Sequence, residues 1–208
     1  MPRVLRDGRT QVCTVPCAVP VCGSSIGTSS SGIPLASPTG CCFAGWVIDI
    51  ETPRLSLHAI DESEAGRICA RAAGPEDRWA ADYPFAGDLA AVGSFLRATE
   101  QLGEQRPFGY YQIIPAADGL AVGGAGFKGL PRDASVEVGY GLAPSARGHG
   151  YATEALTALL TLAANHGVAA VLADTTDDNI ASQRTLARAG FTFVGADADL
   201  QHYEIRTT

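Results

Sequence analysis

The sequence predicts a single α+β domain with a mixed, mostly antiparallel sheet, preceded by a segment that does not pack. Two observations carry this prediction. From residue 46 onward, stretches with the two-residue period of strands alternate with stretches that have the longer period of helices. The composition, 46% hydrophobic and 18% charged with 24 glycines, is typical of a compact, turn-rich globular chain. At 208 residues the chain is long enough for one well-buried core and short for two.

Residues 1–45 have the character of an extension outside the folded domain, which we place at residues 46–208. Short serine runs are mixed with proline and glycine in this extension, and neither period persists there. Its apolar stretch is short and is interrupted by Pro16 and Pro20, unlike a secretory signal. We therefore expect a cytoplasmic protein.

Cysteines are concentrated in the same extension, since five of the six precede residue 43 and Cys69 alone follows. The folded domain is therefore not expected to be held by disulfides. The spacing of Cys13, Cys17 and Cys22 resembles a set of zinc ligands, but no histidine lies nearby and no short-spaced cysteine pair follows. We expect no metal site.

The formal net charge of −7 bears on the partners of the protein. An anionic surface disfavours binding to nucleic acid, whose phosphates it would repel. The same charge fits a cationic substrate such as an amine. No apolar run is long enough to cross a bilayer, so no membrane partner is expected.

The first half of the domain alternates strands with helices. The expected elements are strands over residues 47–50 and 55–60 and helices over residues 61–73 and 88–102. Asp61 and Glu64 have the spacing of a capping box, in which each side chain bonds the other residue's backbone N–H. The connection between the helices is rich in aromatic residues. We expect its aromatic side chains, Trp79, Tyr83 and Phe85, to pack in the core. A lid over the substrate is the alternative.

The second half begins with an antiparallel meander and ends in alternating helices and strands. The meander strands are expected over residues 109–114, 120–127 and 136–142. A long helix with an apolar stripe, a buried strand, another helix and two last strands follow, over residues 150–165, 168–173, 179–189, 191–194 and 203–205. We expect a central sheet of about six or seven strands, flanked by about four helices.

The segment between the third meander strand and the long helix carries the strongest chemical signal. A strand that ends at Leu142 passes through a glycine turn into a helix, so unpaired backbone N–H groups gather at one point. Gly148 and Gly150 leave the main chain open to a phosphate, and the helix dipole adds partial positive charge. Arg147 contributes a fixed cation. These are the properties of a diphosphate site, although a plain structural turn would share the glycines.

Two other nucleotide motifs fit this segment less well. A P-loop would need Gly-Lys-Ser or Gly-Lys-Thr after a spaced glycine, and the sequence has neither. A Rossmann fingerprint is closer, because Gly148, Gly150 and Thr153 follow a strand and Asp174 ends the next one. However, threonine stands where the third glycine belongs, and a meander precedes the motif where a parallel βαβ unit should begin.

Two segments in register resemble the acyl-CoA motifs of the GNAT N-acetyltransferases. The family pattern is Arg or Gln, two residues, Gly, one residue, then Gly or Ala, and it is filled by Arg147, Gly150 and Ala152. Downstream, residues 178–191 are similar to the second motif of the family. Residues 51–55, Glu-Thr-Pro-Arg-Leu, resemble the opening of the subgroup that includes the ribosomal-protein N-terminal acetyltransferases.

The resemblance covers residues 46–208 and implies the GNAT fold. In that fold the strand before the loop and the strand after the long helix splay apart. The implied co-substrate is acetyl-CoA, whose pantetheine lies in the gap between these strands, and no metal is implied. The residues implied to bind it are Leu142, Ala143, Arg147, Gly148, His149, Gly150, Tyr151, Ala152, Asn179 and Ser182.

The resemblance also implies roles in catalysis. An amine acceptor must lose a proton before it attacks the thioester, and Glu137, on the strand that carries the splay, is our candidate base. A solvated or ion-paired glutamate is the alternative. The Leu142 N–H would stabilise the oxyanion. Many family members protonate the departing thiolate with a tyrosine of the second motif, where this sequence has Leu186. Ser182, one helical turn earlier on the same face, is the second catalytic candidate.

These residues predict an enzyme that moves an acetyl group from acetyl-CoA directly to a primary amine, on a small molecule or at a protein N-terminus. A covalent acyl-enzyme is disfavoured, because Cys69 has no neighbouring base in the sequence. A non-catalytic acyl-CoA-binding regulatory module stays open as the alternative. The sequence does not specify the acceptor, and a homodimer also stays open.

Overall fold

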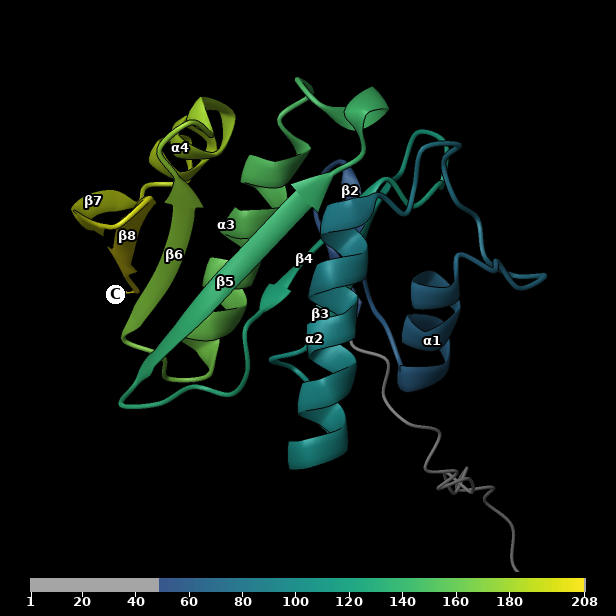
Figure 1. Cartoon of the computed structure of the whole chain (residues 1–208), viewed down its shortest axis with the longest axis horizontal. Helices are drawn as coiled ribbons and strands as arrows, with labels where there is room; N and C mark the ends of the chain where they lie inside the picture. Colours follow the sequence, from purple (N-terminus) through teal and green to yellow (C-terminus); the bar gives the residue numbers. More distant parts are fainter. Residues whose placement is uncertain (1–48, 208) are drawn as a thin grey trace, which may run out of the picture. The chain divides into compact units, whose positions relative to one another are not determined.

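The computed structural model describes residues 49–207 (Figure 1). In chain order its elements are β1 (Ile50–Glu51), β2 (Leu55–Ala59), α1 (Glu62–Ala70), α2 (Ala86–Leu102), β3 (Tyr110–Pro115), β4 (Gly123–Phe127), β5 (Ser135–Leu142), α3 (Tyr151–Asn165), β6 (Ala170–Thr176), α4 (Ile180–Arg188), β7 (Thr192–Asp197) and β8 (Leu200–Arg206). The predictions for residues 1–45, and for the first expected strand before residue 49, lie outside the described residues. None of the helices in residues 49–207 has the length and hydropathy needed to span a membrane.

The strands form one sheet in the order β1-β2-β3-β4-β5-β6-β8-β7. The meander β3-β4-β5 is antiparallel as predicted, and β5 and β6 are the one parallel pair among the strands described. The predicted α+β class is confirmed, and a doubly wound parallel sheet is excluded. The described residues contribute eight strands to this one sheet, slightly more than the six or seven expected, because both edge strands, β1 and β7, belong to it.

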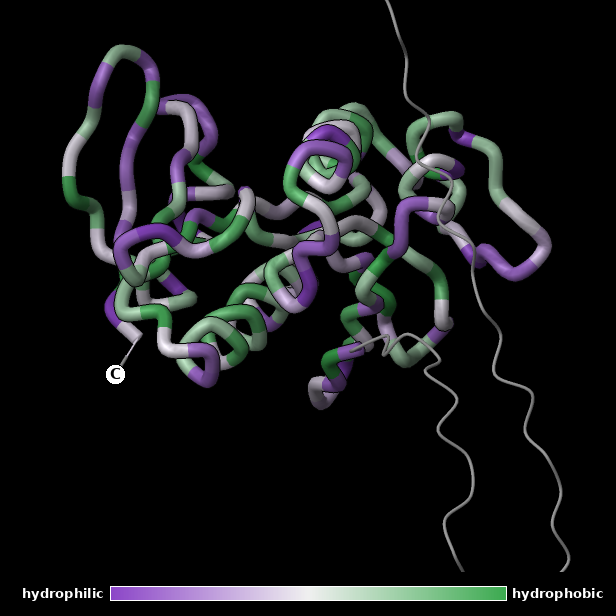
Figure 2. The backbone as a smooth tube through the Cα atoms, turned by 90° about the horizontal axis from the view of Figure 1, so that it is seen from below, coloured by the Kyte–Doolittle hydropathy of each residue, from purple (hydrophilic) through white to green (hydrophobic). Residues whose placement is uncertain are grey.

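Helices cover both faces of the sheet. In Figure 1, α1 and α2 lie in front of the sheet and α3 lies behind it, and Figure 2 shows helices on two sides of the strands from below. The apolar stripe of α3 packs against the sheet in the main core, and its buried members are Ala152, Ala155, Leu156, Leu159 and Ala163. A smaller core joins α1 and α2 to the front face, around Ile68, Val92 and Tyr110.

The predicted capping box fixes the start of α1. Asp61 Oδ1 accepts from the Glu64 N–H (2.8 Å), and Glu64 Oε2 accepts from the Asp61 N–H (2.8 Å). The sequence predicts a helix that ends near Ala73, but α1 ends earlier, at Ala70. The reason is that Arg71 adopts the left-handed backbone (φ 52°) that stops a helix.

Glycines in β4 and β5 let aromatic side chains approach the front of the sheet closely. A Cβ at Gly124 would lie 1.9 Å from the hydroxyl oxygen of Tyr110, and one at Gly141 would lie 2.6 Å from the ring of Phe85. Tyr83 is also buried. The aromatic connection between α1 and α2 therefore packs on the sheet beside the end of β5, in agreement with the core packing predicted for it.

The prediction of a buried strand is wrong for one face of β6. Val171, Ala173 and Thr175 are buried, whereas Leu172 is 36% exposed and Asp174 is half-buried. In Figure 1, α1 and α2 cover the front of the sheet up to β5, and no described helix lies in front of β6. The front of β6 is therefore open beside β5.

Candidate functional site

The glycine loop lies where the sequence places it, between the end of β5 and the start of α3. A short 3₁₀ turn, Pro144–Ala146, leads into the loop, and α3 begins at Tyr151. Gly148 (φ 82°) and Gly150 (φ 79°) both have the left-handed backbone that favours glycine. Gly150 is the N-cap, and no side chain caps the first turn. The backbone N–H groups of that turn are therefore open to an anion.

The other residues predicted for the loop present different faces. Arg147 is exposed, and its Nε donates to the Leu142 carbonyl (3.1 Å). His149 stacks on Tyr151 with the ring centroids 5.5 Å apart. Ala152 is buried against the core, so the main chain alone can serve a ligand at this position.

β5 and β6 pair at their beginnings and then part. Their parallel register runs from Ser135 and Ala170 to Glu137 and Leu172 and ends there, although β5 continues to Leu142. Figure 1 shows the two strands diverging toward the end of the sheet that carries the loop. The splay that belongs to the predicted fold is therefore present.

The edge of β5 presents to this gap backbone groups that do not pair with β4, and among them the Leu142 carbonyl accepts from Arg147. The Ala143 N–H donates to the Val122 carbonyl (2.8 Å), which fixes the alternation of the antiparallel β4–β5 ladder. In that alternation the N–H and C=O groups of Tyr140 and Leu142 point away from β4, into the gap. Of the predicted pair Leu142 and Ala143, Leu142 alone offers its N–H there, because that of Ala143 is bound to β4.

Glu137 lies where β5 and β6 begin to part. Its carboxylate forms an ion pair with Lys128, whose Nζ also donates to Asp174 on β6 (2.8 Å). Burial lowers the pKa of Lys128, but the hydrogen bonds to Asp174 and Glu137 outweigh burial and raise the pKa above its ordinary value. Lys128 therefore stays charged and holds two carboxylates at the base of the gap.

The second predicted segment forms the start of α4. Asn179 caps this helix, because its Oδ1 accepts from the Ser182 N–H (3.1 Å). Ser182 Oγ lies 2.7 Å from the hydroxyl oxygen of Tyr140, and either group can donate. Leu186, one turn later, is fully buried in the core. A tyrosine from β5 therefore reaches α4, a contact that the sequence does not reveal.

The α1–α2 connection is tied to the glycine loop. Asp82 accepts hydrogen bonds from the Ser145 N–H (2.9 Å) and from the Ser145 hydroxyl (2.8 Å), and both lower the pKa of Asp82. Ser145 lies in the 3₁₀ turn that leads into the loop. The connection thus helps to fix the position of the loop, although nothing in the sequence pattern marks Asp82.

Asp88 is a buried carboxylate where the sequence predicts no more than the start of a helix. It is 1% exposed, and it accepts from the Phe85 N–H (3.1 Å) and the Tyr110 hydroxyl (3.0 Å). Burial raises the pKa of Asp88 to about 6, although these two hydrogen bonds act to lower it. An aspartate in the first turn of a helix is common on protein surfaces, so its residue type gives no sign of burial.

This raised pKa makes stability depend on pH in a defined direction. The folded protein binds the Asp88 proton more tightly than the unfolded chain, so the contribution of Asp88 to the free energy of unfolding falls as the pH rises from about 4 to about 7. The shift corresponds to about 3 kcal/mol. We expect Asp88→Asn to remove this contribution, because an amide does not titrate and can keep both hydrogen-bond partners. Urea unfolding across this pH range measures the effect, and equal slopes for the two proteins would contradict it.

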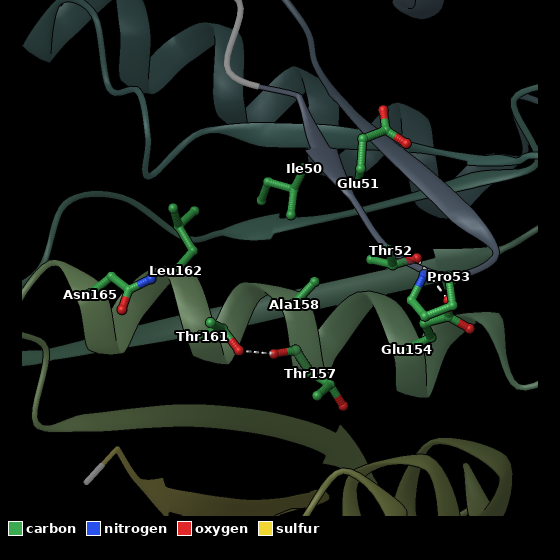
Figure 3. A pocket seen from close by; sticks show the side chains of 10 residues that line it. All are labelled: Ile50, Glu51, Thr52, Pro53, Glu154, Thr157, Ala158, Thr161, Leu162 and Asn165. Carbon is green, nitrogen blue, oxygen red and sulfur yellow. Dashed lines mark hydrogen bonds between the residues drawn. The ribbon is translucent and has the colours of Figure 1, made fainter.

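A separate groove of about 420 Å³ lies along the outer side of α3, beside β1 (Figure 3). Ile50 and Thr52 line it on one side, and Ala158 and Leu162 line it on the other. Glu154 lies at the end of this groove nearest the start of α3. Its lining includes no residue of β5 or β6, so the groove is distinct from the gap between these strands.

Comparison with known proteins gives these features a family context. The profile of the acetyltransferase (GNAT) domain matches residues 54–192. YjdG, an uncharacterised N-acetyltransferase of Bacillus subtilis (strain 168), is 27% identical over 162 residues, which cover 74% of this chain and 95% of that protein.

Two solved structures illustrate the similarity in fold. RimL, a ribosomal-protein α-N-acetyltransferase solved in complex with coenzyme A, has a TM-score of 0.56 at 20% identity. The match covers 76% of this chain and 97% of RimL. The ribosomal-protein-S5-alanine acetyltransferase of Vibrio fischeri also has a TM-score of 0.56, at 17% identity, with 77% of this chain and 97% of that one covered.

Proposed function

Because the chain belongs to the GNAT family, and is thus an acyl-CoA-dependent acetyltransferase, we propose that it moves the acetyl group of acetyl-CoA directly to a primary amine. The observation that carries this proposal is the glycine loop at the open end of the gap between β5 and β6 (Figure 1). Open N–H groups suit a diphosphate, and an edge of unpaired peptide groups suits the amides of pantetheine. The acceptor is a small-molecule amine or a protein N-terminus, as in the name of RimL.

The loop and the edge of β5 together hold the co-substrate in this proposal. The N–H groups and the dipole at the start of α3 bind the diphosphate, with Arg147 beside them. The N–H and C=O groups of Tyr140 pair with the pantetheine amides, which leaves the Leu142 N–H for the acetyl group. The Oδ1 atom of Asn179 serves as the helix cap, which leaves the side-chain N–H₂ group to bind the same arm.

Proton transfer then begins at the base of the gap. Glu137 takes a proton from the acceptor ammonium through water, because it lies five residues before Leu142 on β5, and the neutral amine attacks the thioester carbonyl. The Leu142 N–H, which faces the gap, stabilises the oxyanion of the tetrahedral intermediate. The C–S bond breaks as the amide forms, and the thiolate needs a proton to leave as CoA.

The hydrogen-bonded pair of Tyr140 and Ser182 supplies that proton in our proposal. Burial raises the pKa of Tyr140. The hydrogen bonds to Ser182 and Thr185 act to lower it but offset only part of this rise. The Tyr140 hydroxyl therefore stays protonated at neutral pH. A donor from another element is needed because Leu186, at the position where many family members have a tyrosine, has no proton to give.

We expect Tyr140→Phe to lower kcat by about tenfold or more, because it removes one hydroxyl of the pair. The Kd for CoA should change by less than about twofold, since the main chain of residue 140 is kept. A double variant that also carries Ser182→Ala should have a kcat no lower than that of the less active of the two single variants. Steady-state kinetics and calorimetry measure these values. Multiplicative losses would show that the two hydroxyls act separately.

Membership of the GNAT family argues against the alternative considered from the sequence, a non-catalytic acyl-CoA-binding module. The ion pair of Lys128 with Glu137 is the observation in its favour, because it occupies the proposed base. Thiol release from acetyl-CoA across a panel of small amines and N-terminal peptides separates the two functions. Turnover on any amine supports the transferase. Tight CoA binding in calorimetry without turnover on the whole panel would support the binding module, and no binding of CoA would exclude both.

A further inference from the structure

The glycine loop is held from behind by an arginine that lies just before β2. Arg54 Nη1 donates to the His149 carbonyl (2.9 Å). Its guanidinium lies over the ring of Tyr151, 5.3 Å from the centroid. Arg54 Nη2 lies 3.5 Å from the place where a Cβ on Gly150 would be. Arg54 thus contacts or flanks three consecutive loop residues from a position far away in the sequence.

The same arginine neutralises a carboxylate in the first turn of α3. Arg54 Nε and Nη2 lie 2.7 Å and 2.6 Å from Glu154 Oε2. The other carboxylate oxygen accepts from the Arg54 N–H (3.0 Å) and the Thr52 hydroxyl (2.7 Å), and Figure 3 shows Thr52 beside Glu154. Burial raises the pKa of Glu154, but the hydrogen bonds from Thr52 and Arg54 outweigh burial and lower it. Glu154 is therefore ionised, and both of its oxygens are used.

The geometry of the peptide bond gives these contacts a consequence for the loop. In a trans peptide the carbonyl and the following N–H point in opposite directions. Because Arg54 binds the His149 carbonyl, the Gly150 N–H points away from Arg54, to the opposite side of the loop. An unpaired Glu154 would place a negative charge in the turn that has to receive an anion. The ion pair with Arg54 cancels this charge.

We propose that Arg54 is a positioning residue for the diphosphate subsite: it orients the His149–Gly150 peptide and neutralises Glu154, and it does not itself bind the diphosphate. This inference rests on the proposed use of acetyl-CoA and assigns a further residue to the same site. It also gives residues 51–55 a physical role, since Thr52 and Arg54 are the side chains that hold Glu154.

Calorimetry with CoA on single and double variants tests the proposal. We expect Arg54→Met to weaken CoA binding by about tenfold, because it releases the His149 carbonyl and leaves Glu154 unpaired. Adding Glu154→Gln to this variant should restore the Kd to within about threefold of the wild-type value, because the opposing charge is gone. If Arg54 bound the phosphates directly, the double variant would stay as weak as the single one. That result would overturn the proposal.

A donor without a diphosphate provides the second readout. Arg54→Met should raise the KM for acetyl-CoA by about tenfold and leave kcat/KM for S-acetylpantetheine within about twofold. Equal losses with both donors would overturn the proposal, because they would reflect damage beyond the diphosphate subsite. Arg97→Met is the matched control, since its guanidinium bonds Ser94 on α2, and it should change neither value. A wild-type protein that binds no CoA would defeat the proposed function, whereas equal binding by wild type and Arg54→Met would defeat this inference alone.

Discussion

Gly148→Asp is expected to weaken CoA binding by about a hundredfold, whereas Gly148→Asn should weaken it by no more than about fivefold. Both residues tolerate the left-handed backbone of Gly148 (φ 82°) better than other side chains do. A Cβ at this position would meet no atom within 4 Å, so neither variant should clash. The variants differ by one negative charge beside the proposed diphosphate, which costs about 2 to 3 kcal/mol of binding free energy.

Calorimetry with CoA measures both variants, and thermal unfolding shows whether each keeps its fold. The difference between them should shrink at high salt, because mobile ions screen exposed charges. Equal CoA affinities for the two variants at low salt would mean that no phosphate lies near position 148. The loop would then lose its role as the diphosphate subsite.

Much of the fold could be predicted because local signals and tertiary packing agree. The capping box of Asp61 and Glu64 and the apolar stripe of α3 are both written in short-range spacing. The errors arise where packing between distant segments decides the outcome. Leu172 is exposed because α1 and α2 stop short of β6, and no pattern inside residues 168–173 contains that information.

The part of the site that could be predicted also depends on residues close together in the sequence. The glycines of the loop follow one another in the chain, so their spacing is visible in the sequence. Lys128, Tyr140 and Arg54 reach their partners across 9, 42 and 95 positions. No rule of helix or strand periodicity connects residues at such separations. Lys128 in particular could have been sought by asking which cation faces Glu137 across the meander.

Glu137→Gln is expected to lower kcat by about 100- to 1,000-fold, because glutamine cannot accept the proton of the ammonium acceptor. Glutamine has nearly the same shape, and its carbonyl can still accept a hydrogen bond from Lys128. The Kd for CoA should stay within about twofold of the wild-type value, since Glu137 lies at the base of the gap and the loop lies at its open end. Thiol release with an active amine, together with calorimetry, measures both quantities.

Asp174→Asn is the matched control, because Asp174 binds the same lysine from the facing strand (2.8 Å). Its loss leaves the pair of Lys128 and Glu137 intact, so kcat should fall by less than about fivefold. The two carboxylates share Lys128 as their counter-ion, but Glu137 lies on β5 and Asp174 on β6. A large loss of kcat in Asp174→Asn with none in Glu137→Gln would therefore identify Asp174 as the base. Small losses in both variants would mean that neither carboxylate takes the proton, because an essential base cannot be removed without slowing the reaction that depends on it.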